Sequence, residues 1–279
     1  MSFQSEPRVV AIVSARMASS RYPGKAIVPL KGRPLLAVLL ERIASTPSLD
    51  SVCLATSRGR DNVVLFEIAS ALGIPTHRGD EHDVLLRYVE CARMMKADHV
   101  VRVTGDNPLT DLETIDRLVE QHVAEHADYT YVPGDALLMG ILPEVISRAA
   151  LERSWEHGQA RHRSELVTLY IKEHPQEFRI AIGKLPGGLY RPEYRLTVDE
   201  AEDVRLLQEI FERLQKPGKH VTTREAIALL DREPKLAEIN AHLRHKAANL
   251  RSVKLDEGIA AEVRRWTPVP PSAGGRGRG

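Results

Sequence analysis

Short apolar runs alternate with helical patterns through the first half of this 279-residue chain, and this alternation constrains the fold most strongly. Apolar runs predict strands at 9–15, 51–56, 74–77, 98–105 and 128–132. Helical periodicity predicts helices at 34–45, 62–73, 83–95 and 111–126, with Asp61 and Asp111 as candidate caps. Runs such as "VVAIV" are apolar at every position, which is typical of parallel strands buried on both faces. We therefore expect an α/β fold with a mostly parallel central sheet and helices on both faces.

The regular alternation of strand and helix patterns ends after residue 133. Turn formers are mixed with apolar residues at 133–146, which predicts a projecting arm, and Leu138 and Ile141 are expected to lie exposed on it. An exposed apolar arm favours a covering partner, so we expect a homodimer. Helices are expected at 147–157, 160–173 and 200–214, and strands at 178–186 and 194–198. The predicted organisation is one α/β domain at 1–214, a helical C-terminal extension at 215–267 and a disordered Pro/Gly-rich tail at 268–279.

The composition of the chain limits which cellular compartment and which kinds of partner are expected. The formal net charge is +1, so no overall basic field favours nucleic acid as a partner. The sequence contains no run of about 18 apolar residues, so no transmembrane helix is expected. The N-terminus lacks the apolar core of a signal peptide. Cys53 and Cys91 do not suggest a disulfide framework. We expect a cytoplasmic protein without a membrane partner.

The stretch "SARMASSRYPGK" at 14–25 follows the first predicted strand. Arg16, Arg21 and Lys25 lie within ten positions, without an acidic residue among them. Ligands of open α/β sheets bind at the carboxyl edge of the strands, and a polyphosphate needs several cations there. A surface turn with solvated arginines is the alternative. The stretch lacks the glycine pattern of the P-loop and that of the dinucleotide-binding loop, so phosphates would be held by another geometry.

A second candidate site follows the predicted strand at 98–105. In "TGDNP", Asp106 comes directly after Gly105, which permits unusual backbone conformations. A carboxylate at the same sheet edge, facing a polyphosphate, is a candidate Mg²⁺ ligand.

These residues carry a family resemblance. The segment "ARMASSRYPGKAIVPLKGRPLL" resembles the signature loop of the cytidylyltransferase family that includes the SpsF-like proteins of spore-coat polysaccharide synthesis. It is similar, more distantly, to CMP-KDO and CMP-sialic acid synthetases. Further blocks follow in the family's order: "LATS", "RGDEHDVLLRY", "VVRVTGDNPLTD", "MGILPEV" and "RLTVDEAED". The resemblance spans residues 9 to about 214 and implies a Rossmann-like nucleotide-diphospho-sugar transferase fold.

The resemblance implies a reaction in which an acceptor oxygen attacks the α-phosphorus of CTP and pyrophosphate leaves. Arg16 and Lys25 would be catalytic cations, and Asp199 would join Asp106 as the second ligand of Mg²⁺. Arg78 would contact the base or remain a solvated strand-end cation, and Asp83 would line the base pocket or merely cap a helix. The implied nucleotide contacts are Ser14, Ala15, Arg21, Thr56, Ser57, Arg78, Asp83 and Asp106.

The acceptor side is marked by two glutamates. The resemblance implies acceptor contacts at Glu144, in "PEV", and at Glu165, in "SELVT". Ser164 and Leu166 depart from the family's pattern there, which leaves the acceptor's identity open. A sugar acid or related polar metabolite is the expected acceptor of CMP. The alternatives are a phosphate or phosphonate acceptor, or a non-catalytic nucleotide-binding protein.

Overall fold

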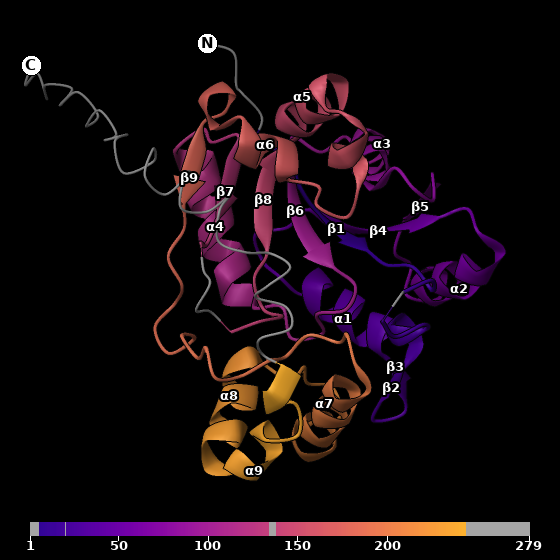
Figure 1. Ribbon diagram of the computed structural model, residues 1–279, viewed down its shortest axis with the longest axis vertical. Helices are drawn as coiled ribbons and strands as arrows, with labels where there is room; N and C mark the ends of the chain where they lie inside the picture. Colours follow the sequence, from indigo (N-terminus) through magenta and orange to yellow (C-terminus); the bar gives the residue numbers. More distant parts are fainter. Residues whose placement is uncertain (1–5, 20, 134–137, 244–279) are drawn as a thin grey trace, which may run out of the picture.

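The computed structural model describes residues 6–19, 21–133 and 138–243 (Figure 1). The disordered tail expected at 268–279 and the end of the expected helical extension lie outside the described residues. None of the described helices is long and apolar enough to cross a membrane.

In the described part of the chain, a seven-stranded sheet has the order β5-β4-β1-β6-β8-β7-β9. The strands β1, β4, β5 and β6 pair in parallel, as expected from the alternation of strands and helices, and β7 pairs in parallel with β9. The strand bounds are β1 Val9–Ser14, β4 Ser51–Ser57, β5 Thr76–Gly79, β6 His99–Thr104, β7 Tyr129–Tyr131, β8 Glu144–Ser147 and β9 Ile180–Ile182. A separate small hairpin pairs β2 Pro29–Leu30 with β3 Arg33–Pro34.

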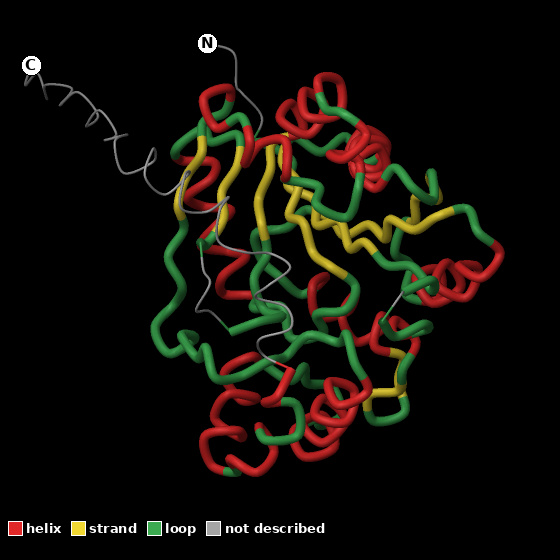
Figure 2. Tube along the Cα trace, viewed as in Figure 1, coloured by secondary structure: helices red, strands yellow, loops and turns green. Residues whose placement is uncertain are grey.

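Helices cover both faces of this sheet (Figure 2). Buried side chains of α1, α2 and α4 pack on one face, and those of α3, α5 and α6 on the other. The helices α7, α8 and α9 lie together at the bottom of Figure 1, where they share a third apolar cluster. The bounds are α1 Leu35–Ala44, α2 Val63–Ala71, α3 Val84–Met94, α4 Leu112–Ala124, α5 Arg148–His157, α6 Leu169–Glu173, α7 Ala201–Leu214, α8 Thr223–Arg232 and α9 Pro234–Ala237. Short 3-10 helices are η1 Lys25–Ile27, η2 Arg60–Asn62, η3 Ala160–Arg163, η4 Pro175–Glu177 and η5 Ala241–Leu243. The α/β fold with a mostly parallel sheet and helices on both faces is confirmed.

The strand β8 was not expected. It runs antiparallel between β6 and β7, so the residues assigned to the end of the projecting arm belong to the middle of the sheet. Leu138 and Ile141, expected to be exposed, are fully buried in the apolar cluster of α7 and α8. The exposed apolar surface that suggested a homodimer is therefore absent at these two residues, because the chain buries it against its own helices.

Two further expectations were wrong. The residue before α2 is Asn62, and Asp61 lies inside η2, so Asp61 does not cap that helix. The segment 194–198 is not a strand, since its only ladder contact among the described residues is a bridge between Met139 and Arg195. Gly140 allows this contact, because a Cβ there would lie 2.4 Å from the backbone nitrogen of Thr197.

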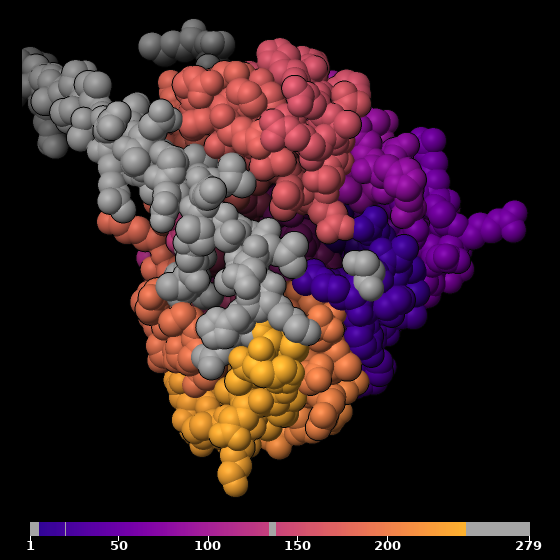
Figure 3. Space-filling model, in the orientation of Figure 1, coloured from indigo at the N-terminus to yellow at the C-terminus, as the bar shows by residue number. Residues whose placement is uncertain are grey.

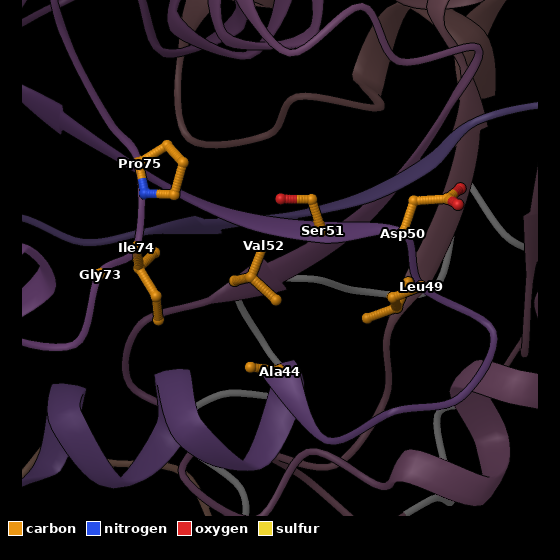
Figure 4. A pocket seen from close by; sticks show the side chains of 8 residues that line it. All are labelled: Ala44, Leu49, Asp50, Ser51, Val52, Gly73, Ile74 and Pro75. Carbon is orange, nitrogen blue, oxygen red and sulfur yellow. The ribbon is translucent and has the colours of Figure 1, made fainter.

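A hollow of about 230 Å³ lies at the amino edge of the sheet, where β4 and β5 begin (Figure 4). Its lining combines apolar side chains such as Val52 and Ile74 with Asp50 and Ser51. Asp50 accepts a hydrogen bond from the backbone of Val9 at 2.7 Å and so fastens β1. The hollow is at the opposite end of the strands from the cationic loop, so it lies away from the candidate site.

Candidate nucleotide and metal site

The cationic loop folds back on itself directly after β1. The backbone nitrogen of Gly24 donates to the carbonyl of Met17 at 2.9 Å, and Gly24 has a φ of 76°, which favours glycine. The side chain of Asn62 accepts from the backbone of Met17 at 2.8 Å and donates to Ser57 Oγ at 2.7 Å. The end of β4 therefore holds the loop in place through one buried amide.

Lys25 lies at the centre of the site. Its Nζ donates to Asp106 Oδ2 at 2.7 Å, to Asp199 Oδ1 at 3.0 Å and to the carbonyl of Val198 at 2.8 Å. Arg21 adds a second cation, with Nη2 2.7 Å from the same oxygen of Asp199. The structure thus brings together four residues singled out from the sequence: two cations of the loop and both predicted metal carboxylates.

Burial and neighbouring charges have opposite effects on the pKa values of Lys25 and Asp106. Burial lowers the pKa of Lys25, but Asp106 and Asp199 outweigh that effect and the pKa is raised overall. Burial raises the pKa of Asp106, but Lys25 outweighs it and the pKa is lowered overall. Both groups are therefore charged at neutral pH.

Asp199 reaches the site although no strand precedes it. The backbone nitrogen of Val198 donates to the carbonyl of Asp106 at 2.9 Å, which holds the two segments side by side. Gly105 makes the neighbouring approach possible, since a Cβ there would lie 2.6 Å from Ala15 Cβ and 2.8 Å from the Ser14 carbonyl. The ends of β1 and β6 therefore meet closely beside the two carboxylates.

The third loop cation points elsewhere. Arg16 forms an ion pair with Glu165, whose side chain is 70% exposed. Exposed ion pairs contribute little stability, so Arg16 can leave this partner at small cost. The pair joins the nucleotide loop to the segment that carries a predicted acceptor contact.

The two predicted acceptor residues are linked by an arginine that the sequence did not single out. Arg102 on β6 donates to Glu144 Oε2 at 2.5 Å and to the carbonyl of Glu165 at 3.2 Å. Tyr129 donates to Glu144, and Lys172 Nζ lies 3.6 Å from it. Burial raises the pKa of Glu144, but Arg102 and Lys172 outweigh it and lower the pKa to about 2. This polar group lies on one face of the sheet, and Figure 3 shows a recess between the segment around residues 160–170 and the indigo N-terminal loop.

Three of the other predicted nucleotide contacts, Ser14, Ala15 and Ser57, have hydrogen-bond partners within the protein, whereas Thr56 differs. Ser14 and Ala15 are held at the end of β1, where the Ser14 carbonyl accepts from Gly105 and Ala15 donates to Ala55. Thr56 and Ser57 are buried at the end of β4; the Thr56 hydroxyl has no hydrogen-bond partner among the described residues. Ser57 donates to Glu81.

Arg78 and Asp83 form local contacts. Arg78 donates to the carbonyls of Arg58 and Gly59 at 3.1 and 3.4 Å. Asp83 caps α3 by accepting from Leu86 at 2.8 Å, and its other oxygen accepts from Trp155 at 3.1 Å. The cap is thus confirmed, and contact with a base remains a prediction for both residues.

Magnesium is the ion that the family resemblance implies, and the donor set fits it. Asp106 and Asp199 come from separate segments and converge on one cation, the Lys25 ammonium, with carboxylate oxygens. Mg²⁺ prefers oxygen ligands and usually takes one or two carboxylates, with phosphate oxygens and water completing its shell. In the described part of the chain no cluster of three or more His, Cys, Asp or Glu side chains offers a metal site made by the protein alone. The two aspartates therefore suit an ion that arrives with a phosphate ligand.

Known proteins resemble this chain in sequence and in fold. The chain is 34% identical to the spore coat polysaccharide biosynthesis protein SpsF of Bacillus subtilis over 236 residues, which covers 82% of this chain and 96% of SpsF. It superposes on a cytidylyltransferase from Leptospira borgpetersenii with a TM-score of 0.77 and 24% identity, over 83% of this chain and 97% of that one. A CMP-2-keto-3-deoxy-manno-octonic acid synthetase solved with CTP shares the fold, with a TM-score of 0.57 and 16% identity, over 74% and 99% of the chains.

The family described as Cytidylyltransferase matches residues 10–244, which include every site residue discussed above. The expected fold, the enzyme class and the resemblance to SpsF-like proteins are therefore confirmed. The chain belongs to the cytidylyltransferase family of enzymes.

Proposed function

We propose that this enzyme transfers CMP from CTP to a small polar acceptor and releases pyrophosphate. The observation that carries the proposal is the convergence of Lys25, Arg21, Asp106 and Asp199 at the carboxyl edge of the sheet. Cations for phosphates and carboxylates for a metal are the two requirements of nucleotidyl transfer, which depends on positioning and charge stabilisation. The CTP-bound relative of the same fold supports the choice of nucleotide.

Different residues of the site would have different roles in this reaction. Mg²⁺ held by Asp106 and Asp199 would supply neutralisation of charge on the triphosphate. Lys25 and Arg21 would bind the phosphates and stabilise the departing pyrophosphate, while Arg16 would leave Glu165 to join them. The folded loop, fastened by Asn62, would orient the α-phosphorus toward the acceptor.

Glu144, Arg102 and Lys172 support an acceptor site beside the nucleotide loop. Arg102 and Lys172 both lie against the half-buried Glu144, so the two cations outnumber the carboxylate that they share and suit the anionic group of an acceptor. We propose a sugar acid, held by Arg102 and Lys172 at its carboxylate. Glu144 and Glu165 would then bind sugar hydroxyls. A phosphate or phosphonate acceptor would use the same cations and is the alternative.

A binding protein without activity would not need two carboxylates on one cation, so catalysis is favoured. Homodimer formation and a cytoplasmic location remain predictions from the sequence. Light scattering at micromolar concentration tests the dimer, and a monomer would contradict it.

Pyrophosphate release tests the proposed reaction. The purified enzyme with CTP and Mg²⁺ is offered three sets of acceptors: sugar acids, sugar phosphates and phosphonates. We expect release with a sugar acid and none without an acceptor. Release with a phosphonate alone would support the alternative acceptor, and release from ATP but not CTP would contradict cytidylyl transfer.

A further inference from the structure

Asp199 is held from two opposite sides. Its Oδ1 faces the site and contacts Lys25 and Arg21, whereas its Oδ2 accepts from Arg195 Nη2 at 3.0 Å. The Arg195 side chain is 3% exposed, so it lies on the interior side of the carboxylate. The orientation of this metal-ligand candidate therefore depends on a buried arginine that no ligand is expected to touch.

Arg195 is fixed in turn by Asp203 on α7. Asp203 accepts from Arg195 Nε at 2.8 Å and from Nη2 at 2.9 Å. The same carboxylate accepts from the backbone nitrogens of Asp199 and Glu200, both at 3.0 Å. Asp203 is fully buried, and it ties the backbone of Asp199 as well as its side chain.

The last partner comes from the C-terminal part of the chain. Asn240, between α9 and η5, donates from Nδ2 to Asp203 Oδ1 at 2.8 Å and to the carbonyl of Arg195 at 3.0 Å. It is 2% exposed. A buried amide is costly unless its hydrogen bonds are made, and apolar contacts of Leu236 already hold α9 on the domain.

We propose that Asn240 is a positioning residue for Asp199, acting through Asp203 and Arg195. This inference rests on the proposed function, in which Asp199 holds Mg²⁺. A buried ion pair keeps one geometry only when its remaining donors and acceptors are satisfied, and Asn240 completes the set around Asp203. The helices after residue 214 thus set the metal affinity of a site that lies at the edge of the sheet.

The test compares Asn240→Leu with Leu236→Ala. The first removes the amide at similar volume, and the second weakens the packing of α9 without touching Asp203 or Arg195. Each protein is titrated with Mg²⁺ at saturating CTP, and the melting temperature gives the metal concentration at half of the shift. We expect Asn240→Leu to raise this concentration on the order of tenfold, as for residues that orient metal ligands. Leu236→Ala should lower the starting melting temperature and leave the metal midpoint unchanged.

An unchanged metal midpoint in Asn240→Leu would overturn the inference, as would an equal rise in Leu236→Ala. A wild-type enzyme without any metal-dependent shift would overturn the proposed function and this inference with it. Should Asn240→Leu fail to fold, Asn240→Ser removes the amide without placing an apolar group against the carboxylate. The same two midpoints then decide the question.

Discussion

The ammonium of Lys25 lies 2.7 Å from the carboxylate of Asp106, although the two residues are 81 positions apart in the chain. The loop after β1 and the turn after β6 meet here because β1 and β6 are parallel neighbours. The ion pair puts a protein cation on a carboxylate that is proposed to hold Mg²⁺. The lysine and the metal therefore compete for the same oxygen atoms, unless a triphosphate draws the lysine away.

Lys25→Met tests this competition. Removing the ammonium frees Asp106 and Asp199 for a divalent ion, so the affinity for Mn²⁺ without nucleotide should rise about tenfold, equivalent to about 1.4 kcal/mol. Binding of CTP should weaken in the same variant, because one of the cations proposed to bind its phosphates is lost. Electron paramagnetic resonance of free Mn²⁺ measures the first effect, and calorimetry with CTP measures the second.

Lys31→Met is the matched control, since Lys31 Nζ contacts only the carbonyls of Glu212 and Gln215, both at 3.0 Å, among the described residues. It should change neither affinity. An unchanged Mn²⁺ affinity in Lys25→Met would show that the lysine does not compete with the ion.

Gly105→Ala tests the close approach of β1 and β6. The added methyl would lie 2.6 Å from Ala15 Cβ and 2.8 Å from the carbonyl of Ser14, so the backbone must shift. We expect a loss of about 1–3 kcal/mol in the free energy of unfolding. Gly187→Ala is the control, because a methyl there meets nothing within 4 Å. Equal stability of both variants in urea unfolding would contradict the close approach.

The parallel half of the sheet was predictable because β1 and β4 carry continuous apolar runs and because helical patterns separate the successive strands. The strand β8 was not predictable, because only four residues form it and the turn formers before it suggested an arm. Leu138 and Ile141 were expected to be exposed for the same reason. Their burial depends on α7 and α8, which follow much later in the chain and whose packing no local pattern reveals.

A buried histidine pair predicts a pH dependence of stability. His122 Nε2 lies 3.1 Å from His99 Nδ1, and its Nδ1 lies 2.8 Å from Thr130 Oγ1. Burial, with a smaller effect of His99, lowers the pKa of His122 from 6.5 to about 3. The unfolded chain therefore binds a proton between these values that the folded chain does not.

Stability should fall as the pH decreases from about 6.5 toward 3, by up to about 1.4 kcal/mol per pH unit from this residue. His122→Gln should flatten the slope of unfolding free energy between pH 6.5 and 4, measured in urea. His126→Asn is the control variant, at an exposed residue with a φ of 49° that asparagine tolerates. An equal slope in His122→Gln and the wild type would show that His122 is not the group responsible.

The candidate site was predictable in its cations and carboxylates and not in what holds them. Arg21, Lys25 and Asp106 follow predicted strands, so the local pattern indicated them, whereas Asp199 was implied by the family resemblance. Asp203 was interpretable only as an acidic residue in the first turn of a helix, where the helix dipole favours it. Its buried contacts with Arg195 and Asn240 join distant segments, and a linear pattern does not show burial of a charge.

The most direct test of the account measures melting temperature with CTP, UTP, ATP and GTP, each with and without Mg²⁺. A nucleotide that binds only the folded state raises the melting temperature, so the best ligand gives the largest shift. We predict the largest shift with CTP and Mg²⁺, and its loss in Asp106→Asn and in Asp199→Asn, which keep shape but remove one charge. A larger shift with ATP than with CTP, or an undiminished CTP shift in both variants, would contradict a cytidylyl-transfer site built on these two aspartates.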